Sequence, residues 1–171
     1  ENFKVNETAQ NQKRVGEKQR GPNTGGMEAY SPAIIINSKV EKKIISKIIK
    51  PTLYALKKKK NPYTGFLYVG LMIIKDEPYL IEYNVRMGDP ECQVILPRLK
   101  TDILKIFNAV INNRIKNINI KWKKEKCMTI VLCSKGYPGS YEKNIKIKNI
   151  TNLKLKKNTY IFHAGTKLIK D

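Results

Sequence analysis

The stretch IEYNVRMGDPECQ, residues 81–93, carries polar side chains at alternate positions. Successive side chains of a β-strand point to opposite faces, so we expect Glu82, Asn84 and Arg86 on one face, about 7 Å from one to the next. A carboxylate and an amide supply hard oxygen ligands that suit Mg²⁺ bridging phosphates. An arginine can stabilise a developing phosphoryl or acyl-phosphate oxyanion. The same spacing fits an antiparallel strand with one solvated face, and spacing alone favours that simpler interpretation.

Two other stretches could bind a charged ligand. In GPNTGG, residues 21–26, glycines let backbone N–H groups approach an anion, and Asn and Thr add donors. This stretch is neither a P-loop nor a dinucleotide fingerprint, and alone it fits an ordinary turn. In GDPE, residues 88–91, Asp89 could cap a helix that has Pro90 at its first position. That interpretation is compatible with carboxylates that hold a substrate amine.

Histidine and cysteine offer little further chemistry. His163 is the only histidine, which excludes a two-histidine site, and no G-x-S-x-G motif accompanies it. We expect a structural role for it at the end of a strand. Cys92, Cys127 and Cys133 form no C-x-x-C pair, so their spacing does not indicate a zinc site. Unpaired thiols in a chain without a signal segment indicate a reducing cytoplasm.

The apolar pattern predicts the elements that position these side chains. Helical spacing predicts a helix over 38–60, capped by Ser38 and kinked or broken at Pro51. The apolar run 65–74 predicts a buried strand, which returns through the four-residue turn KDEP as a second strand over 79–86.

The remaining elements follow from the same criteria. The Gly- and Pro-containing residues 8–32 are typical of loops, and 92–113 have the period of a second helix. Further strands are expected over 128–134, 144–150 and 158–165.

The charge of +20 raises the possibility of a nucleic-acid-binding module. However, only five of the 34 basic residues are arginine, the residue preferred for phosphate recognition. Lysine is abundant together with isoleucine and asparagine, and all three have AT-rich codons, so a biased genome explains the composition better than a binding patch. We expect neither a membrane-spanning segment nor a secretory signal, because no run of 18 apolar residues occurs and the start is polar.

Taken together, the motifs are far more specific than any one of them. TAQNQKRVG, GPNTGGMEAYSP, NPYTGFLYVGLMI, IEYNVRMGDPECQVILPRLKTDIL, CSKGYPGSYEK and FHAGTK occur in this order. Over roughly residues 7–167 the chain resembles the phosphoribosylamine–glycine ligase family of the ATP-grasp superfamily. The resemblance implies an α+β fold, namely the second half of an ATP-grasp domain, with an antiparallel sheet and helices, followed by part of a small β-rich C-terminal domain. The implied boundaries are 1–113 for the ATP-grasp part, 114–125 for a linker and 126–171 for the incomplete C-terminal domain.

The resemblance also implies an activity. That family joins glycine to 5-phosphoribosylamine with ATP and Mg²⁺ (or Mn²⁺), through glycyl phosphate, in purine biosynthesis. We therefore expect a cytoplasmic enzyme, monomeric when complete, with no nucleic-acid or membrane partner. The family pattern assigns metal binding to Glu82 and Asn84 and a catalytic role near the acyl phosphate to Arg86. It assigns substrate binding to Asn23, Thr24, Gly25, Gly26 and Asp89.

Some positions depart from the family pattern. Glu28 stands where the family usually has Gly, Asn11-Gln12 where it commonly has Asp-His, and Gln19 ends a stretch that is usually acidic. These departures put substrate affinity in doubt. The family's chain is more than twice as long, so the resemblance implies an internal fragment that is inactive alone. Another ATP-grasp carboxylate–amine ligase or carboxylase, and a lysine-rich nucleic-acid-binding module, are the alternatives.

Overall fold

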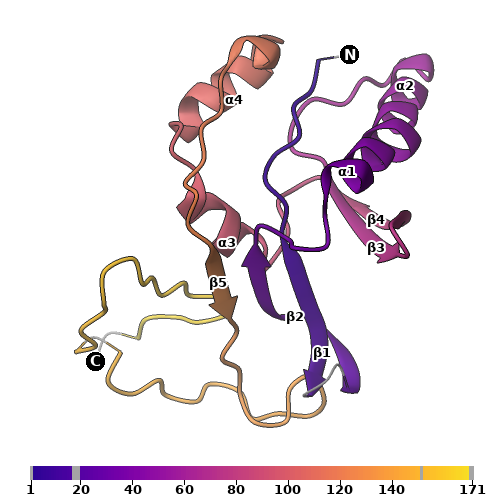
Figure 1. The fold of residues 1–171 in the computed structure, drawn as a ribbon. Coiled ribbons are helices and arrows are strands. Elements are labelled where there is room, and N and C mark those ends of the chain that lie inside the picture. Colours follow the sequence, from indigo (N-terminus) through magenta and orange to yellow (C-terminus); the bar gives the residue numbers. More distant parts are fainter. Residues whose placement is uncertain (1, 17–19, 151, 170–171) are drawn as a thin grey trace. The chain divides into compact units, whose positions relative to one another are not determined.

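The computed structural model describes residues 2–16, 20–150 and 152–169. The chain divides into two compact units, Glu1–Leu132 and Cys133–Asp171. The first unit combines antiparallel strands with helices (Figure 1), so the predicted α+β class with antiparallel sheets is confirmed. No helix among the described residues combines the length and apolar character needed to cross a membrane.

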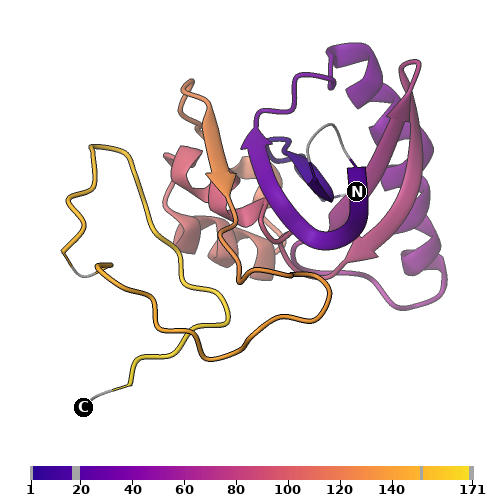
Figure 2. The same cartoon turned by 90° about the horizontal axis from the view of Figure 1, so that it is seen from below.

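A three-stranded antiparallel sheet contains most of the stretch that the sequence predicted as loops. β1 (Gln10–Gly16) and β2 (Arg20–Ser31) form a long hairpin, and β5 (Cys127–Ile130) pairs with the other edge of β2. The loop prediction for 8–32 is therefore wrong. The glycines of β2 and Pro22 lie where the pairing with β1 shifts its register, and β2 bends along its length (Figure 2).

One helical segment follows, composed of α1 (Ser38–Ile44), a π-helical turn η2 (Ile45–Ile49) and α2 (Lys50–Lys58). Its N-cap is Asn37 rather than the predicted Ser38, because the Asn37 side chain accepts hydrogen bonds from the N–H groups of Lys39 and Val40. Helical structure continues through Pro51. The Lys50 N–H donates to the Ile45 carbonyl, and this wider turn directly precedes the residue that has no N–H to donate.

The predicted strand pair is present as β3 (Tyr68–Ile74) and β4 (Glu77–Asn84), which pair antiparallel. The turn has two residues instead of four, since Lys75 and Asp76 adopt φ values of 50° and 60°. Two central residues with positive φ match the twist of a tight hairpin. Both views show the helical segment beside this hairpin (Figures 1 and 2).

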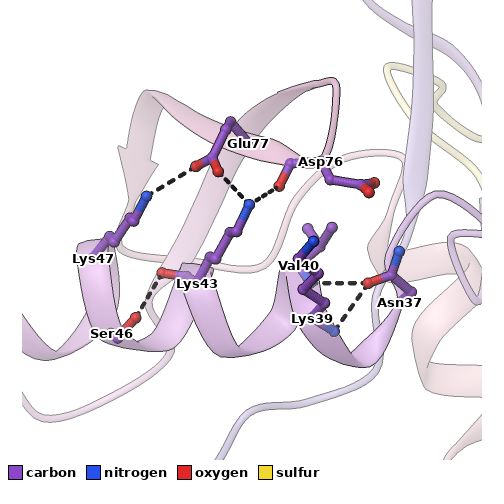
Figure 3. A network of polar contacts seen from close by, with 8 residues as sticks. All are labelled: Asn37, Lys39, Val40, Lys43, Ser46, Lys47, Asp76 and Glu77. Atoms are coloured by element: carbon purple, nitrogen blue, oxygen red, sulfur yellow. Dashed lines mark hydrogen bonds and ion pairs between the residues drawn. The ribbon is translucent and has the colours of Figure 1, made fainter.

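Ion pairs connect the helical segment to the β3–β4 turn (Figure 3). Lys43 Nζ forms an ion pair with Glu77 Oε1 and donates to the Asp76 carbonyl oxygen at 2.9 Å. Lys47, one helical turn later, reaches Glu77 Oε2 at 2.9 Å. One carboxylate therefore holds two lysines at the tip of the hairpin.

The predicted helix over 92–113 is two helices. α3 (Cys92–Ile95) runs into the 3₁₀ turn η3 (Leu96–Arg98), and α4 (Ile103–Ile111) begins after a break. The single-helix prediction is wrong because Leu99 is extended and forms a β-bridge with Trp122, after which Asp102 caps α4. A small apolar core then forms around α4 and the 3₁₀ turn η4 (Ile115–Asn117), from Ile106, Ala109, Ile115, Leu99, Val110, Ile118 and Ile120.

The second unit contains neither helix nor strand among its described residues. The strands predicted over 144–150 and 158–165 are therefore absent there, and Ile145 and Ile147 of the first alternating run are exposed. An alternating sequence forms a strand only where a neighbouring strand offers hydrogen bonds.

The division between the units comes after Leu132. The sequence placed a linker earlier, over 114–125. β5 accounts for the difference, because its pairing with β2 ties residues 127–130 to the first unit. The predicted assignment of 1–113 and 126–171 to two domains of a complete protein stays a prediction.

Candidate functional site

Glu82 and Asn84 lie on one face of β4, as their spacing predicts. Cross-strand pairing places Gly70 opposite Glu82 and Tyr68 opposite Asn84. A side chain at Gly70 would be too close to Glu82, since its Cβ would lie 2.8 Å from Glu82 Cγ. The glycine thus leaves this face of the hairpin open around the carboxylate.

The alternation predicted for the rest of the stretch is interrupted on both sides. A bulge places Leu71 opposite Leu80, so Ile81 has no cross-strand partner. The strand ends at Asn84, and Arg86 therefore lies in the bend that follows. The Arg86 side chain is exposed, and its Nη1 donates to the Met87 carbonyl oxygen at 2.8 Å.

A buried carboxylate connects this hairpin to the opening one. Glu91 is only 3% exposed, and its Oε1 accepts hydrogen bonds from the Tyr68 hydroxyl at 2.8 Å and from Asn11 Nδ2 at 2.9 Å. Burial, the Glu91 carboxylate and Glu82 raise the pKa of the Tyr68 hydroxyl, while Arg86 acts in the opposite direction. Tyr68 is thus within electrostatic range of Glu82, Arg86 and Glu91.

The opening hairpin contacts the same face through β1. Lys13 Nζ lies 3.4 Å from Glu82 Oε1, with both side chains nearly half exposed. The Lys13 carbonyl accepts a hydrogen bond of 2.8 Å from the Thr24 hydroxyl, which in turn accepts from the Gly26 N–H at 3.0 Å. The GPNTGG stretch is therefore an irregular part of β2. Its Thr24 hydroxyl and Gly26 N–H form hydrogen bonds inside the β1–β2 hairpin.

Gly26 brings the second and third predicted stretches together. Its φ is +142°, which favours glycine, and a Cβ there would overlap Pro90 Cδ and lie 2.8 Å from Asn11 Nδ2. GPNTGG thus packs against GDPE, next to Asp89. Asn23 precedes Gly26 in β2, is exposed and lies opposite Arg14 of β1.

Asp89 does not cap the following helix. Glu91 is the residue that precedes α3, and Asp89 Oδ1 accepts a hydrogen bond of 2.7 Å from Gln93 Nε2. The predicted N-cap role is therefore wrong. Asp89 is exposed beside the buried Pro90, a position that leaves its charge at the surface of the site.

The predicted histidine and cysteines form no catalytic arrangement among the described residues. His163 is exposed, and its Nδ1 lies 3.1 Å from Thr166 Oγ1. Burial raises the pKa of the Cys92 and Cys127 thiols, which makes them less reactive. Among the described residues, no three His, Cys, Asp or Glu side chains gather in a way that could hold a metal ion.

Two of the three departures from the family pattern face each other. Gln12 and Glu28 are cross-strand partners in the β1–β2 hairpin, and both side chains are partly buried. Glu28 thus lies on the strand that carries GPNTGG. Gln19 lies outside the described residues.

Comparison with known proteins assigns the chain to a family. Residues 1–92 match the model of the phosphoribosylglycinamide synthetase ATP-grasp (A) domain. The chain belongs to this family. The family assignment agrees with the predicted resemblance and with the antiparallel α+β architecture, and it disfavours the alternative of a nucleic-acid-binding module.

Individual relatives extend the similarity beyond the matched domain. The chain is 46% identical over 161 residues to a phosphoribosylamine–glycine ligase of Agrobacterium fabrum, covering 94% of this chain and 38% of that protein. It is 44% identical over 166 residues to the ligase of the same name in Caldanaerobacter subterraneus, covering 97% and 39%. A crystal structure of phosphoribosylamine–glycine ligase from Thermotoga maritima is similar with a TM-score of 0.63 and 36% identity, covering 78% of this chain and 33% of that one. The chain thus spans about two fifths or less of the length of these relatives.

Tyr68 and Glu91 were absent from the predicted site residues. Glu91 stood in the GDPE stretch, but sequence alone did not distinguish it from an exposed carboxylate. Tyr68 is a residue with a polar tip inside an otherwise apolar run, and it lies two positions before Gly70. The register of the hairpin places Tyr68 on the Glu82 face, and the hydrogen bond from the Tyr68 hydroxyl brings Glu91 next to Tyr68.

Proposed function

We propose that the chain, within a protein of the length of its relatives, forms part of an ATP-dependent ligase that joins glycine to 5-phosphoribosylamine. The observation that carries this proposal is the polar face of β4, where Glu82 and Asn84 lie beside Tyr68 and Lys13 of the opening hairpin pairs with Glu82. Family membership and the names of the relatives support the same reaction.

The side chains of this face fit a magnesium ion that is shared with a nucleotide. Glu82 offers an exposed carboxylate and Asn84 an amide oxygen, and Gly70 leaves room around the carboxylate. Because the described residues contain no three-residue cluster of acidic or other metal-binding side chains, these two would leave most positions to phosphate oxygens and water. That division is typical of Mg²⁺ in nucleotide sites, and Mn²⁺ accepts similar ligands. The bound ion would neutralise phosphate charge.

The proposed reaction needs no side-chain nucleophile. The glycine carboxylate attacks the γ-phosphorus of ATP to give glycyl phosphate and ADP, and the amine of phosphoribosylamine then attacks the glycyl carbonyl and releases phosphate. Arg86 is exposed in the bend after β4, where its guanidinium can stabilise negative charge on the acyl phosphate. Catalysis then depends mainly on the placement of the two substrates.

The contact between the opening hairpin and the GDPE turn supports the proposed substrate-binding roles. Gly26 packs against Pro90, which brings β2 next to the exposed Asp89 carboxylate. We assign glycine and ribonucleotide binding to this junction, with Asp89 attracting an amine. Further contacts to the substrates would come from β2, through Asn23, Thr24 and Gly25. The Thr24 hydroxyl already forms hydrogen bonds with the Lys13 carbonyl and the Gly26 N–H.

The test is ADP formation by the complete protein. We expect sustained, multiple-turnover ADP release to require glycine, phosphoribosylamine and Mg²⁺ together, and the 171-residue chain alone to release none. ADP release that depends on bicarbonate instead of glycine would support the alternative of a carboxylase. Turnover by the isolated chain would contradict the proposal that it is only part of the ligase. A monomeric complete enzyme, a cytoplasmic location and the absence of nucleic-acid and membrane partners stay predictions.

A further inference from the structure

One chain of hydrogen bonds joins the β3–β4 hairpin, the GDPE turn and the opening hairpin. The Tyr68 hydroxyl on β3 donates to Glu91 in the turn before α3, and Asn11 on β1 donates to the same carboxylate oxygen. These residues are 23 and 80 positions from Glu91 along the chain. Glu91 is therefore the point where the β3–β4 hairpin, the GDPE turn and the opening hairpin meet.

Two glycines shape the space that the Tyr68 ring occupies. A Cβ at Gly70 would lie 3.4 Å from one edge of the ring, at Cε1, and a Cβ at Gly88 would lie 2.6 Å from the other edge, at Cε2. Gly88 also approaches Glu91 so closely that a Cβ would overlap Oε2. The ring is thus held between the strand opposite Glu82 and the turn that follows Arg86.

The hydrogen bonds from Tyr68 and Asn11 to Glu91 are suited to a structural role, in which they hold the two hairpins and the turn together. Glu91 is buried, and the two donors named above are uncharged, so the carboxylate depends on hydrogen bonds for its stabilisation. Loss of either donor would leave the buried carboxylate with fewer hydrogen bonds. The resulting loss of stability would exceed the net contribution of an ordinary hydrogen bond, because the carboxylate would stay buried without that partner. A tyrosine is protonated at neutral pH, and burial together with the Glu91 and Glu82 carboxylates raises the pKa of the Tyr68 hydroxyl further, so this group acts as a donor to Glu91.

We propose that Tyr68 and Glu91 are positioning residues, which set the place of the Glu82–Arg86 segment relative to the opening hairpin. Neither touches a reacting atom in this scheme. Tyr68 lies opposite Asn84 and beside the turn that follows Arg86, so its bond to Glu91 determines how the proposed metal-binding face meets the proposed substrate-binding junction. The inference rests on the proposed function of these residues.

The first test is Tyr68→Phe in the complete protein. This substitution keeps the ring between the two glycines and removes only the hydroxyl. We expect kcat to fall roughly 10- to 100-fold, the scale of a small misplacement of reacting groups, while KM for glycine changes by no more than about threefold. The matched control is Tyr79→Phe, which removes a hydroxyl from an exposed tyrosine on the neighbouring strand and should leave kcat unchanged.

The second test asks whether the two donors act through Glu91. Asn11→Leu should lower kcat, and its combination with Tyr68→Phe should cost less than the product of the two separate losses. Glu91→Gln keeps an acceptor oxygen and should retain more activity than Glu91→Leu. If Tyr68→Phe fails to fold, the comparison of these two Glu91 variants carries the same test.

Amide hydrogen exchange supplies a readout that is independent of turnover. In Tyr68→Phe, amides of residues 85–93 should exchange faster, while those of α4 remain as protected as in the unsubstituted protein. Unchanged kcat with unchanged exchange, or a fall in melting temperature alone, would overturn the inference. An unsubstituted protein without glycine-dependent ADP release would overturn the proposed function instead, and the exchange experiment would still decide whether the link exists.

Discussion

Within the part of the chain that the structure describes, Glu82 forms an ion pair with Lys13 alone, and that pair is exposed. Lys13 lies 3.4 Å away with both side chains nearly half exposed, so water screens the interaction. Such pairs contribute at most about 1 kcal/mol to the free energy of unfolding. In the proposed metal site, the Glu82 carboxylate would therefore exchange the lysine for a metal ion at small cost, in contrast to the buried Glu91.

Glu82→Gln in the complete protein tests this assignment. The substitution keeps the shape of the side chain and removes its charge, so we expect Mg²⁺-dependent ADP release to be abolished. Stability should change by no more than about 0.5 kcal/mol in urea unfolding, because the site is on the surface. Glu41→Gln, at an exposed position of α1, is the control and should retain full activity. Near-normal turnover in Glu82→Gln would remove this residue from the metal site.

Gly88→Ala tests the packing around Tyr68 and Glu91. The added methyl would overlap Glu91 Oε2 and lie 2.6 Å from Tyr68 Cε2, so the ring or the carboxylate must move. We expect a destabilisation of about 1–3 kcal/mol, as for other overpacked positions, together with a loss of activity. Thermal unfolding and the ADP assay measure the two effects. Gly139→Ala, where the added Cβ would lie 3.3 Å from the Gly136 carbonyl oxygen, should cost less; an equal cost would count against the close fit around Tyr68.

At the level of elements, ion pairs connect the helical segment to the β3–β4 turn. Glu77 pairs with Lys43 and Lys47, and hydrogen bonds from both lysines lower the pKa of its carboxyl (Figure 3). A carboxyl whose pKa is lower in the folded state stabilises that state fully above its unfolded pKa. This stabilisation is lost as the pH falls through the lower folded value.

Glu77→Gln should therefore lower the free energy of unfolding at neutral pH but not in strong acid. In urea unfolding between pH 7 and pH 2, we expect the difference between Glu77→Gln and the unsubstituted protein to shrink as the pH falls below the ordinary pKa of glutamate. Added salt at pH 7 should shrink it too, because the lysines are partly exposed. A difference that stays constant over this pH range would show that the ion pairs do not stabilise the turn.

The same elements show what the sequence could and could not predict. The strand pair was predictable from its apolar run and alternation, and Glu82 and Asn84 were placed on their shared face correctly. The two-residue turn was missed because Lys75 and Asp76 adopt positive φ without a glycine to indicate it. The opening hairpin was missed because its glycines, which resemble loop residues in sequence, lie within an irregular strand.

The break between α3 and α4 has a cause that lies far away in the chain. Leu99 is extended because it pairs with Trp122. The apolar periodicity of residues 92–113 does not indicate this pairing, because Trp122 lies outside that range. The bond from Tyr68 to Glu91 is of the same kind, since it depends on the register of one hairpin and on the fold of a separate turn. Contacts of this sort follow from the tertiary structure, whereas the order of the motifs was sufficient to indicate the family.

For the first unit as a whole, one buried arginine connects segments from both ends. The Arg98 side chain is 6% exposed, and its Nη1 donates to Glu7 Oε2 at 2.8 Å and to the buried Ser31 hydroxyl at 2.7 Å. Its Nε donates to the Glu125 carbonyl at 2.9 Å and its Nη2 to the Lys123 carbonyl at 3.1 Å. The guanidinium thus ties the start of the chain, the end of β2 and the segment before β5 to the turn that contains it.

Arg98→Leu removes all four hydrogen bonds and leaves the Glu7 carboxylate and two carbonyl groups without their donor. We expect a loss of about 3–5 kcal/mol in the free energy of unfolding, the cost of breaking a buried ion pair from one side. Arg98→Lys keeps the charge but not the planar fork of donors, so it should recover only a minor part of this loss. Arg114→Leu, at an exposed arginine, is the control and should change stability by no more than about 0.5 kcal/mol. Urea unfolding measures all three, and equal stabilities for Arg98→Leu and Arg114→Leu would show that Arg98 does not hold these segments together.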